Sequence, residues 1–243
     1  MKSIRAKMII SLSLLLAITC IGIGVISDLA ASKSIINQVN QTLPELADQG
    51  AKIVEGRIQT QFNALEILAT NDYIKNPKYT FEDQLPVLME EVQRSGILSL
   101  AVASMDGVSR LTSGATIYIS DREYFKKAIK GENAISDPLA SKEDGAIVVT
   151  YAVPIKYNDQ ITGVLVALTD GKKFSEITND ITFGKSGKSF MINKLGTTIA
   201  HSNIDLVINM DNDFESIKTD PKLKSLVELE KKMAAGQRGA GEY

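Results

Sequence analysis

The stretch AIVVTYAVPIKYNDQITGVLVALTD, residues 146–170, determines the fold class of this chain. It contains two runs rich in β-branched residues, 146–156 and 161–169, with polar residues 158–160 between them. Alternating β-branched runs on either side of a short polar loop are typical of a β-hairpin. We therefore expect two neighbouring strands of an antiparallel sheet here.

The same period-two pattern recurs upstream of this hairpin. Residues 97–104 (ILSLAVAS) indicate a strand, Asp-Gly at 106–107 indicates a tight turn, and residues 108–112 (VSRLT) indicate the returning strand. Apolar residues at helical spacing precede the first strand at 81–94 and follow the last one at 174–180. Helices set beside an antiparallel sheet predict an α+β fold.

The segment ISDREYFKKAIKG, residues 119–131, lies between the two hairpins. Asp121 is a good helix N-cap, and four apolar residues follow it at helical spacing, namely Tyr124, Phe125, Ala128 and Ile129. We expect a short amphipathic helix that ends at Gly131. Arg122 falls in its first turn, where the helix macrodipole disfavours a positive charge. This arginine is therefore the first candidate for a functional residue.

A weaker copy of the strand–turn–strand pattern follows. Residues 189–202 (SFMINKLGTTIAHS) resemble residues 98–113 (LSLAVASMDGVSRLTS), and each stretch has a glycine in its turn. This internal repeat predicts two similar modules in tandem. The chain stops where a further strand is expected, so we expect the second module to be incomplete.

The amino-terminal segment has the features of a membrane anchor. Residues 8–26 are uncharged, and three basic residues precede them. As a helix, these residues span roughly 28 Å, close to the thickness of the hydrocarbon core of a bilayer. The positive-inside rule then predicts residues 1–7 in the cytoplasm, a transmembrane helix at 8–28, and the rest of the chain outside the cell membrane.

Two alternatives to an uncleaved anchor exist for this segment. A cleaved signal peptide has a shorter apolar core, and LAAS at 29–32 offers a cleavage site only at the far end of the run. A lipoprotein anchor at Cys20 is disfavoured because the residues after it continue the apolar run. We favour the uncleaved anchor, with Cys20 as a small apolar residue.

Residues 29–70 are expected to form a long helix. Apolar residues recur at helical spacing from Ile36 to Leu68, with polar residues between them. The stripe is narrow before Ile53, which is typical of a helix that pairs with a copy of itself. We therefore expect a homodimer, although the later part of the helix equally fits packing on its own domain.

The composition excludes several classes of function. The 243-residue chain has a net charge of −2 and is 44% hydrophobic, so it is neither a disordered chain nor a basic nucleic-acid binder. One histidine and one cysteine cannot form a structural zinc site or an intrachain disulfide. We expect no metal and no cofactor. A hydrolase is disfavoured because Ser136-Asp137 with the single distant His201 makes a poor catalytic triad.

Several motifs occur in an informative order after the anchor and the long helix. They are ISDREYFKKAIKGENAISDP (119–138), YAVPI (151–155), GVLVALTD (163–170) and GKSGKSFMINKLGTTIAHSN (184–203). In this order they resemble the double-Cache sensor domain of bacterial transmembrane receptors, and most of all methyl-accepting chemotaxis proteins of the clostridial type. The resemblance implies tandem PAS-like modules, with a ligand site in the membrane-distal module at 71–182 and an incomplete membrane-proximal module at 183–243.

The resemblance also implies specific ligand-binding residues. In the amino-acid-binding branch of this family, an arginine on the short helix holds the ligand carboxylate, and an aspartate at the end of the last distal strand holds the ammonium. Arg122, followed by Tyr124 and Phe125, matches the first motif, and Asp170 matches the second. A guanidinium suits this role because it donates two parallel hydrogen bonds to a carboxylate.

Three further residues are candidates, and the match to the family is incomplete. Tyr118 stands one place away from an expected aromatic residue, and Asp137 precedes a loop, LASKED, that lacks the aromatic and acidic residues expected for an amino group. Tyr151, inside the strand at 146–156, is a candidate for the pocket floor. The motif itself has Tyr124 in place of tryptophan. The ligand is therefore expected to be an amino acid or another small carboxylate.

The resulting functional hypothesis is a transmembrane chemoreceptor and not an enzyme. It senses an extracellular small molecule and signals to cytoplasmic partners through a part of the protein beyond residue 243. The alternative is the same sensor on a histidine kinase or a diguanylate cyclase. The sequence names neither the ligand nor the sign of the response, and it leaves direct sensing and sensing through a binding protein equally open.

Overall fold

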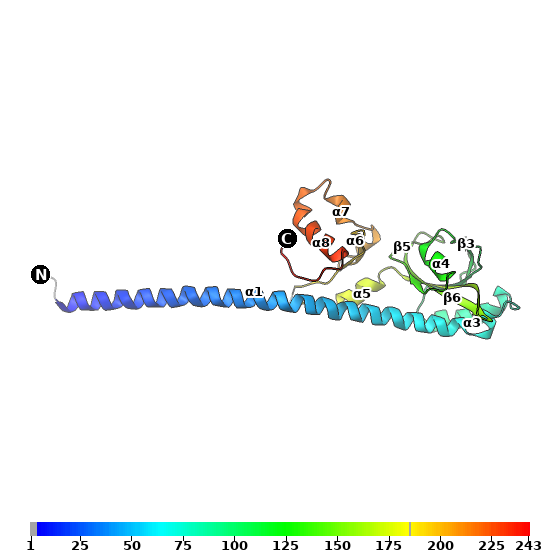
Figure 1. Cartoon of the computed structure of the whole chain (residues 1–243), viewed down its shortest axis with the longest axis horizontal. Coiled ribbons are helices and arrows are strands. Elements are labelled where there is room, and N and C mark those ends of the chain that lie inside the picture. The colour runs from blue at the N-terminus through cyan, green and yellow to red at the C-terminus, as the bar shows by residue number, and fades with distance from the viewer. Residues whose placement is uncertain (1–3, 185) are drawn as a thin grey trace. The chain divides into compact units, whose positions relative to one another are not determined.

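The computed structural model describes residues 4–184 and 186–243 and opens with one long helix, α1 (Ile4–Ala69) (Figure 1). The helix continues through Pro44. By residue contacts the chain divides into two compact units, one up to Leu46 with a short C-terminal piece and one from Ala47 onward. The long helix predicted over residues 29–70 is therefore present.

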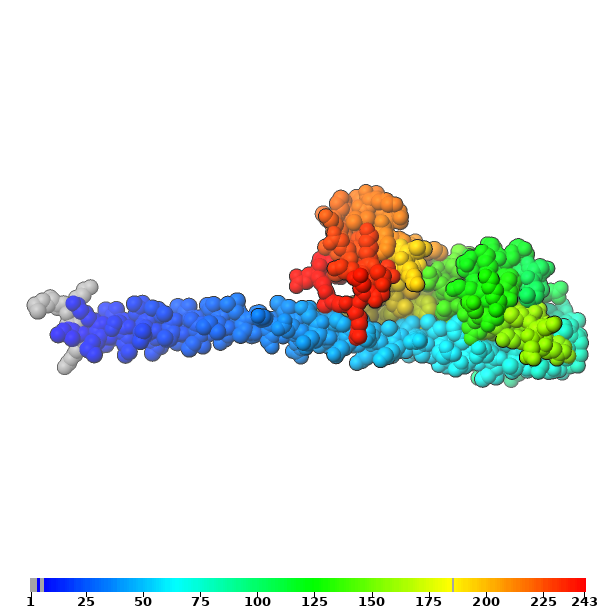
Figure 2. Space-filling view, in the orientation of Figure 1, coloured from blue at the N-terminus to red at the C-terminus, as the bar shows by residue number. Residues whose placement is uncertain are grey.

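The part of α1 in the first unit is strongly apolar, and its side chains are exposed. Leu12, Ile18 and Ile23 have 65%, 59% and 66% of their surface accessible, and Figure 2 shows this part, in blue, as a single rod of side chains. Its most apolar 18-residue window has no buried residue. A helix of this length and composition is suited to cross a membrane.

The second unit is built on a seven-stranded antiparallel sheet. Its order is β3-β2-β1-β7-β6-β4, with β5 also paired to β6. Both predicted hairpins are confirmed, as β1–β2 and β6–β7. The strands in chain order are β1 (Ser99–Ala103), β2 (Val108–Leu111), β3 (Thr116–Tyr118), β4 (Ala134–Ile135), β5 (Leu139–Ala140), β6 (Ile147–Tyr157) and β7 (Gln160–Asp170).

The two hairpin turns have conformations that their residues favour. Asn158 and Asp159, between β6 and β7, both have positive φ, at 49° and 62°. Two consecutive left-handed residues give the type I′ turn that matches the twist of a two-residue hairpin. Gly107, between β1 and β2, has φ 90°, and a Cβ there would lie 2.7 Å from Cβ of Ser120. Only glycine allows this close approach.

The sheet separates two hydrophobic clusters because successive strand residues point to opposite faces. On β6, Val149, Tyr151 and Val153 pack in one cluster, while Val148 and Ala152 pack in the other. Helices cover the first face: the end of α1, α2 (Asp72–Lys75), α3 (Phe81–Ser95) and α5 (Lys173–Asn179). The second face is covered by α4 (Glu123–Ala128) (Figure 1).

The second predicted strand–turn–strand unit is present after α5. It consists of β8 (Met191–Ile192) and β9 (Thr198–Ala200), an antiparallel pair with Gly196 in the turn. A Cβ on Gly196 would lie 2.5 Å from the ring of Phe214, so the turn packs directly on this aromatic residue. The remaining elements are α6 (Ile204–Ile208), α7 (Asp213–Ser216), the 3₁₀ helix η1 (Pro221–Leu223) and α8 (Lys224–Ala234). The α+β fold class is confirmed.

Candidate ligand-binding site

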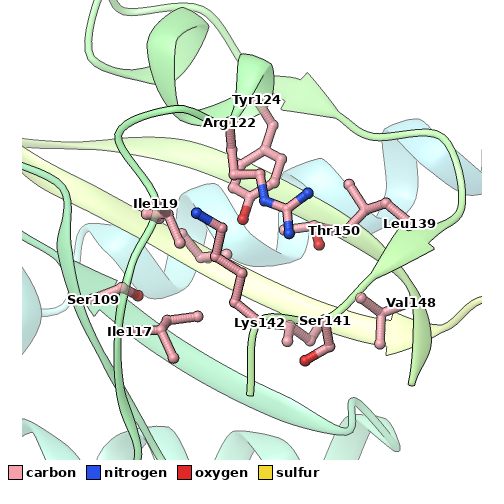
Figure 3. Close-up of a pocket in the computed structure, with 12 residues that line it drawn as sticks. Ser109, Ile117, Ile119, Arg122, Tyr124, Leu139, Ser141, Lys142, Val148 and Thr150 are labelled. Atoms are coloured by element: carbon pink, nitrogen blue, oxygen red, sulfur yellow. The ribbon is translucent and has the colours of Figure 1, made fainter. Parts of the chain in front are cut away.

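A cavity lies on the α4 face of the large sheet, under the segment that follows β5 (Figure 3). Its volume is about 10 Å³, which is room for about one water molecule. Polar side chains line one part of it and aliphatic side chains the rest. The lining residues are Ser109, Ile117, Ile119, Arg122, Tyr124, Leu139, Ser141, Lys142, Val148, Thr150, Val166 and Leu168.

Arg122 lies at the start of α4, but the local geometry differs from the prediction. The helix begins at Glu123, Arg122 itself is the N-cap residue, and no side chain caps this helix. The predicted cap was Asp121, and that prediction is wrong because its carboxylate instead accepts a hydrogen bond from Nζ of Lys142 at 2.6 Å. The Arg122 guanidinium donates through Nη2 to the carbonyl oxygen of Ala140 at 2.9 Å.

Lys142 is the second cation that lines the cavity. Its Nζ donates to the carbonyl oxygen of Tyr118 at 2.9 Å, in addition to Asp121. Its side chain is 30% exposed, against 62% for Asp121. The hydrogen bond from Lys142 lowers the pKa of the Asp121 carboxyl. Together with Arg122, these contacts fasten residues 139–142 across the cavity.

Tyr124 forms a buried wall of the cavity, with only 7% of its surface exposed. Burial raises the pKa of its hydroxyl to about 12, an effect that the positive charge of Arg122 and the neighbouring Thr150 side chain partly offset. The hydroxyl is therefore protonated at neutral pH and is able to donate a hydrogen bond.

Two of the other three aromatic candidates, Phe125 and Tyr151, lie away from the cavity. Phe125 is 2% exposed and belongs to the hydrophobic cluster beneath α4. Tyr151 faces the opposite side of the sheet, where its ring meets Phe62 edge-on with centroids 5.4 Å apart. Since neighbouring residues of a strand point in opposite directions, Thr150 lines the cavity in its place.

The acidic candidates and Tyr118 are also not among the lining residues. Asp170 is exposed at the end of β7, and its Oδ1 accepts a hydrogen bond from the backbone N–H of Lys172 at 2.8 Å. Asp137 Oδ2 accepts from Nδ2 of Asn193 at 2.9 Å. The Tyr118 side chain is 57% exposed, and only its carbonyl oxygen is tied to the site, through Lys142.

Sequence reasoning did not identify Lys142 or Thr150. Strand alternation is a signal for Thr150, because it shares a face with Val148 on β6. Lys142 has no such signal, since its place depends on how the loop after β5 folds back toward α4. Within residues 4–184 and 186–243, no group of three or more His, Cys, Asp or Glu side chains is placed to hold a metal ion.

A larger hollow of about 380 Å³ lies on the other face of the sheet, beside α2 and α3. Gln84 and Arg110 contribute to its lining, and Gln84 Oε1 has no hydrogen-bond partner among the described residues. None of the residues that the sequence predicts for ligand binding lines this hollow. The cavity beside Arg122 is therefore the candidate site.

Comparisons with known proteins agree with the resemblance seen in the sequence. A family model described as a Cache domain matches residues 31–242. The methyl-accepting chemotaxis protein PscA of Pseudomonas syringae pv. tomato is 28% identical over 103 residues, which are 42% of this chain. The aligned region is 16% of that relative's length, so this chain corresponds to a small part of it.

Solved structures show the same fold. The sensory domain of the Campylobacter jejuni chemoreceptor Tlp3, with isoleucine bound, superposes with a TM-score of 0.61 at 15% identity, covering 77% of this chain and 81% of that one. The ligand-binding domain of the Pseudomonas aeruginosa amino acid chemoreceptor PctC, in complex with GABA, gives 0.57 at 15% identity, covering 76% and 83%. The similarity at these identities is one of fold.

Proposed function

Because this chain belongs to the Cache domain family, we propose that it is the sensor part of a transmembrane chemoreceptor. The proposed ligand is a small extracellular carboxylate, with or without an amino group, bound in the cavity beside Arg122. The proposed role is binding and signalling, without catalysis.

The guanidinium of Arg122 carries this proposal. It reaches a cavity whose other walls are largely aliphatic, and the only hydrogen bond described for its side chain is the one to Ala140. Its other N–H groups are thus available to a ligand. A carboxylate is the acceptor that best matches a guanidinium, because two parallel charge-assisted hydrogen bonds can form. Isoleucine and GABA, bound by the two structurally similar sensors, both contain a carboxylate.

The proposed layout follows the order of the chain. Residues 1–7 are cytoplasmic, residues 8–28 cross the membrane, and residues 29–70 form the signalling helix. Residues 71–182 form the membrane-distal, ligand-binding module, and residues 183–243 belong to the membrane-proximal module. The exposed apolar part of α1 and the chemotaxis relatives support a membrane location.

The proposed signal arises from differential binding. A ligand shifts the receptor between two helix arrangements only to the extent that it binds one of them more tightly. The end of α1 packs on the large sheet through Phe62 and Leu65. A conformational change in the sheet is therefore transmitted to this helix through these contacts. A homodimer of the signalling helix, as proposed from its apolar stripe, would pass the change to the cytoplasmic partners.

Calorimetric titration of the full chain in nanodiscs tests the proposal, with small carboxylates and amino acids as probes. Arg122→Lys should weaken binding about tenfold or more, because lysine lacks the two-pronged geometry. The melting temperature without ligand should hardly change. Arg94→Lys, at an exposed arginine of α3, is the matched control. Unchanged binding by Arg122→Ala would contradict the proposed site.

A further inference from the structure

The charges that line the cavity are of one sign. Arg122 reaches it from the start of α4, and Lys142 reaches it from the segment after β5 (Figure 3). None of the described lining residues is acidic. The acid that pairs with Lys142, Asp121, lies outside the lining, and its side chain is 62% exposed. Even with Lys142 neutralised by Asp121, one positive charge is left to be balanced by a ligand.

An ammonium group has no acidic partner in this cavity. The two aspartates that the sequence suggested for this role both accept hydrogen bonds elsewhere, Asp170 from Lys172 and Asp137 from Asn193. The remaining polar groups are neutral hydroxyls, such as those of Thr150 and Tyr124. Burying an ammonium beside two cations, without a carboxylate to pair with it, is unfavourable.

We propose that the ligand is a short aliphatic carboxylate that carries no ammonium group, and that Lys142 is the residue that sets this specificity. The inference rests on the proposed function, because it concerns the same cavity. Lys142 attracts the carboxylate and repels an ammonium at its α- or ω-carbon, which makes it a source of discrimination as well as of affinity.

The rest of the lining suits a short alkyl chain. Val148 of β6 and Val166 and Leu168 of β7 form one aliphatic part of the lining. Ile117 of β3, Ile119 just after β3 and Leu139 of β5 form the rest. Burial of methylene groups against these residues is favourable in proportion to the area removed from water. Among the described lining residues, the neutral hydroxyls of Ser109, Tyr124, Ser141 and Thr150 are placed to bind a polar substituent.

Entry of such a ligand requires residues 139–142 to move, since the cavity of about 10 Å³ holds no more than one water molecule. The same two cations that face the cavity hold this segment, Arg122 through the Ala140 carbonyl and Lys142 through the Tyr118 carbonyl. When a ligand carboxylate takes the place of the Ala140 carbonyl, Arg122 exchanges a neutral acceptor for a charged one. Its hydrogen bonds are then stronger.

Matched ligand triplets test the inference by calorimetry on the full chain in nanodiscs. The first triplet is 4-methylpentanoate, leucine and 3-methylbutylamine, and the second is butanoate, 4-aminobutanoate and propylamine. Straight-chain and branched acids of two to six carbons complete the panel. We expect the best acid to bind at least tenfold more tightly than its amino acid, and the amines not to bind.

Variants assign the specificity to Lys142. Lys142→Gln should weaken acid binding about tenfold and narrow the preference for the acid over its amino acid. Lys142→Arg keeps the positive charge and should keep the preference for the acid over its amino acid. This variant tests the role of the charge even if Lys142→Gln folds poorly. Lys126→Gln, at a lysine of α4 that pairs with Glu123, should leave every affinity unchanged.

Each outcome decides the inference. An amino acid that binds more tightly than its parent acid, and loses this binding in Arg122→Ala, overturns the inference and leaves the proposed function standing. An acid preference that survives unchanged in Lys142→Gln overturns the role of Lys142. Failure of the whole panel to bind overturns both the inference and the proposed function.

Discussion

Gly50 of α1 lies directly against Ile181, which follows α5. A Cβ placed on Gly50 would come within 3.0 Å of Ile181 Cδ1. The absence of a side chain at this position lets the helix backbone approach Ile181, and the contact leaves space for no more than a methyl group.

Substitution of Gly50 should therefore depend on side-chain size. Gly50→Ala should change the free energy of unfolding by less than about 1 kcal/mol, because the gain in helix propensity offsets the tight contact. Gly50→Leu should destabilise by about 1–3 kcal/mol through overpacking. Chemical denaturation of the chain in detergent measures both. Gly56→Ala, with nothing near its Cβ, should stabilise by about 0.5–1 kcal/mol, and an equal response at the two glycines would refute the contact.

Because of Glu230 in α8, the free energy of unfolding should decrease as pH rises. Its side chain is 3% exposed, and Oε2 has no hydrogen-bond partner among the described residues. Burial, then the carboxylates of Asp213 and Asp211, raise its pKa from 4.5 to about 7. The folded state therefore holds a proton that the unfolded state releases above pH 4.5. This stabilisation is complete below that pH and is lost as pH rises through about 7.

Replacing the carboxyl by an amide tests this assignment. Glu230→Gln should be more stable than the unmodified chain at pH 8, by roughly 2–3 kcal/mol, and should flatten the dependence of the unfolding free energy on pH between 5 and 8. Glu228→Gln, an exposed neighbour on the same helix, is the control. An unaltered pH profile in Glu230→Gln would show that another group is responsible.

The apolar stripe of α1 should form contacts between two copies of the chain. Ile36 and Leu43 are 52% and 37% exposed in the single chain. In a Cys20→Ser background, which removes the only cysteine, cysteines at Ile36, Val39 or Leu43 should cross-link in membranes. Cysteines at Lys33 or Gln38 should do so poorly, because they flank the stripe. Similar yields at all five positions would exclude the stripe as an interface.

The sequence was sufficient for the elements whose local and tertiary preferences agree. The β6–β7 hairpin follows from alternation and from a two-residue turn that Asn158 and Asp159 can adopt. The helix at 81–95 follows from its apolar spacing and has a capping box formed by Thr80 and Asp83. The strands β4 and β5, of two residues each, exist only through pairing with β6, so no local pattern predicts them.

The candidate site was predictable only in part, for the same reason. Arg122 and Tyr124 lie on one short helix, so their position relative to each other is a local property. Lys142 enters the site through hydrogen bonds to residues 21 and 24 positions earlier in the chain. Asp121 shows how a long-range contact overrides a local preference. Its position in the sequence favours a helix N-cap, but its carboxylate instead accepts a hydrogen bond from the distant Lys142.

Successive side chains of β6 point to opposite faces of the sheet, so neighbouring residues of this one strand are under different evolutionary constraints. Val148 and Thr150 line the proposed ligand cavity, and Val148 also packs in the cluster beneath α4. Val149, Tyr151 and Val153 belong to the hydrophobic cluster on the other face. If the proposed site is right, a mutation at Thr150 can alter ligand recognition while the odd-numbered residues preserve the packing of their face. A homologue could therefore acquire a different ligand specificity through a few substitutions at cavity-lining positions, while every intermediate sequence remains folded.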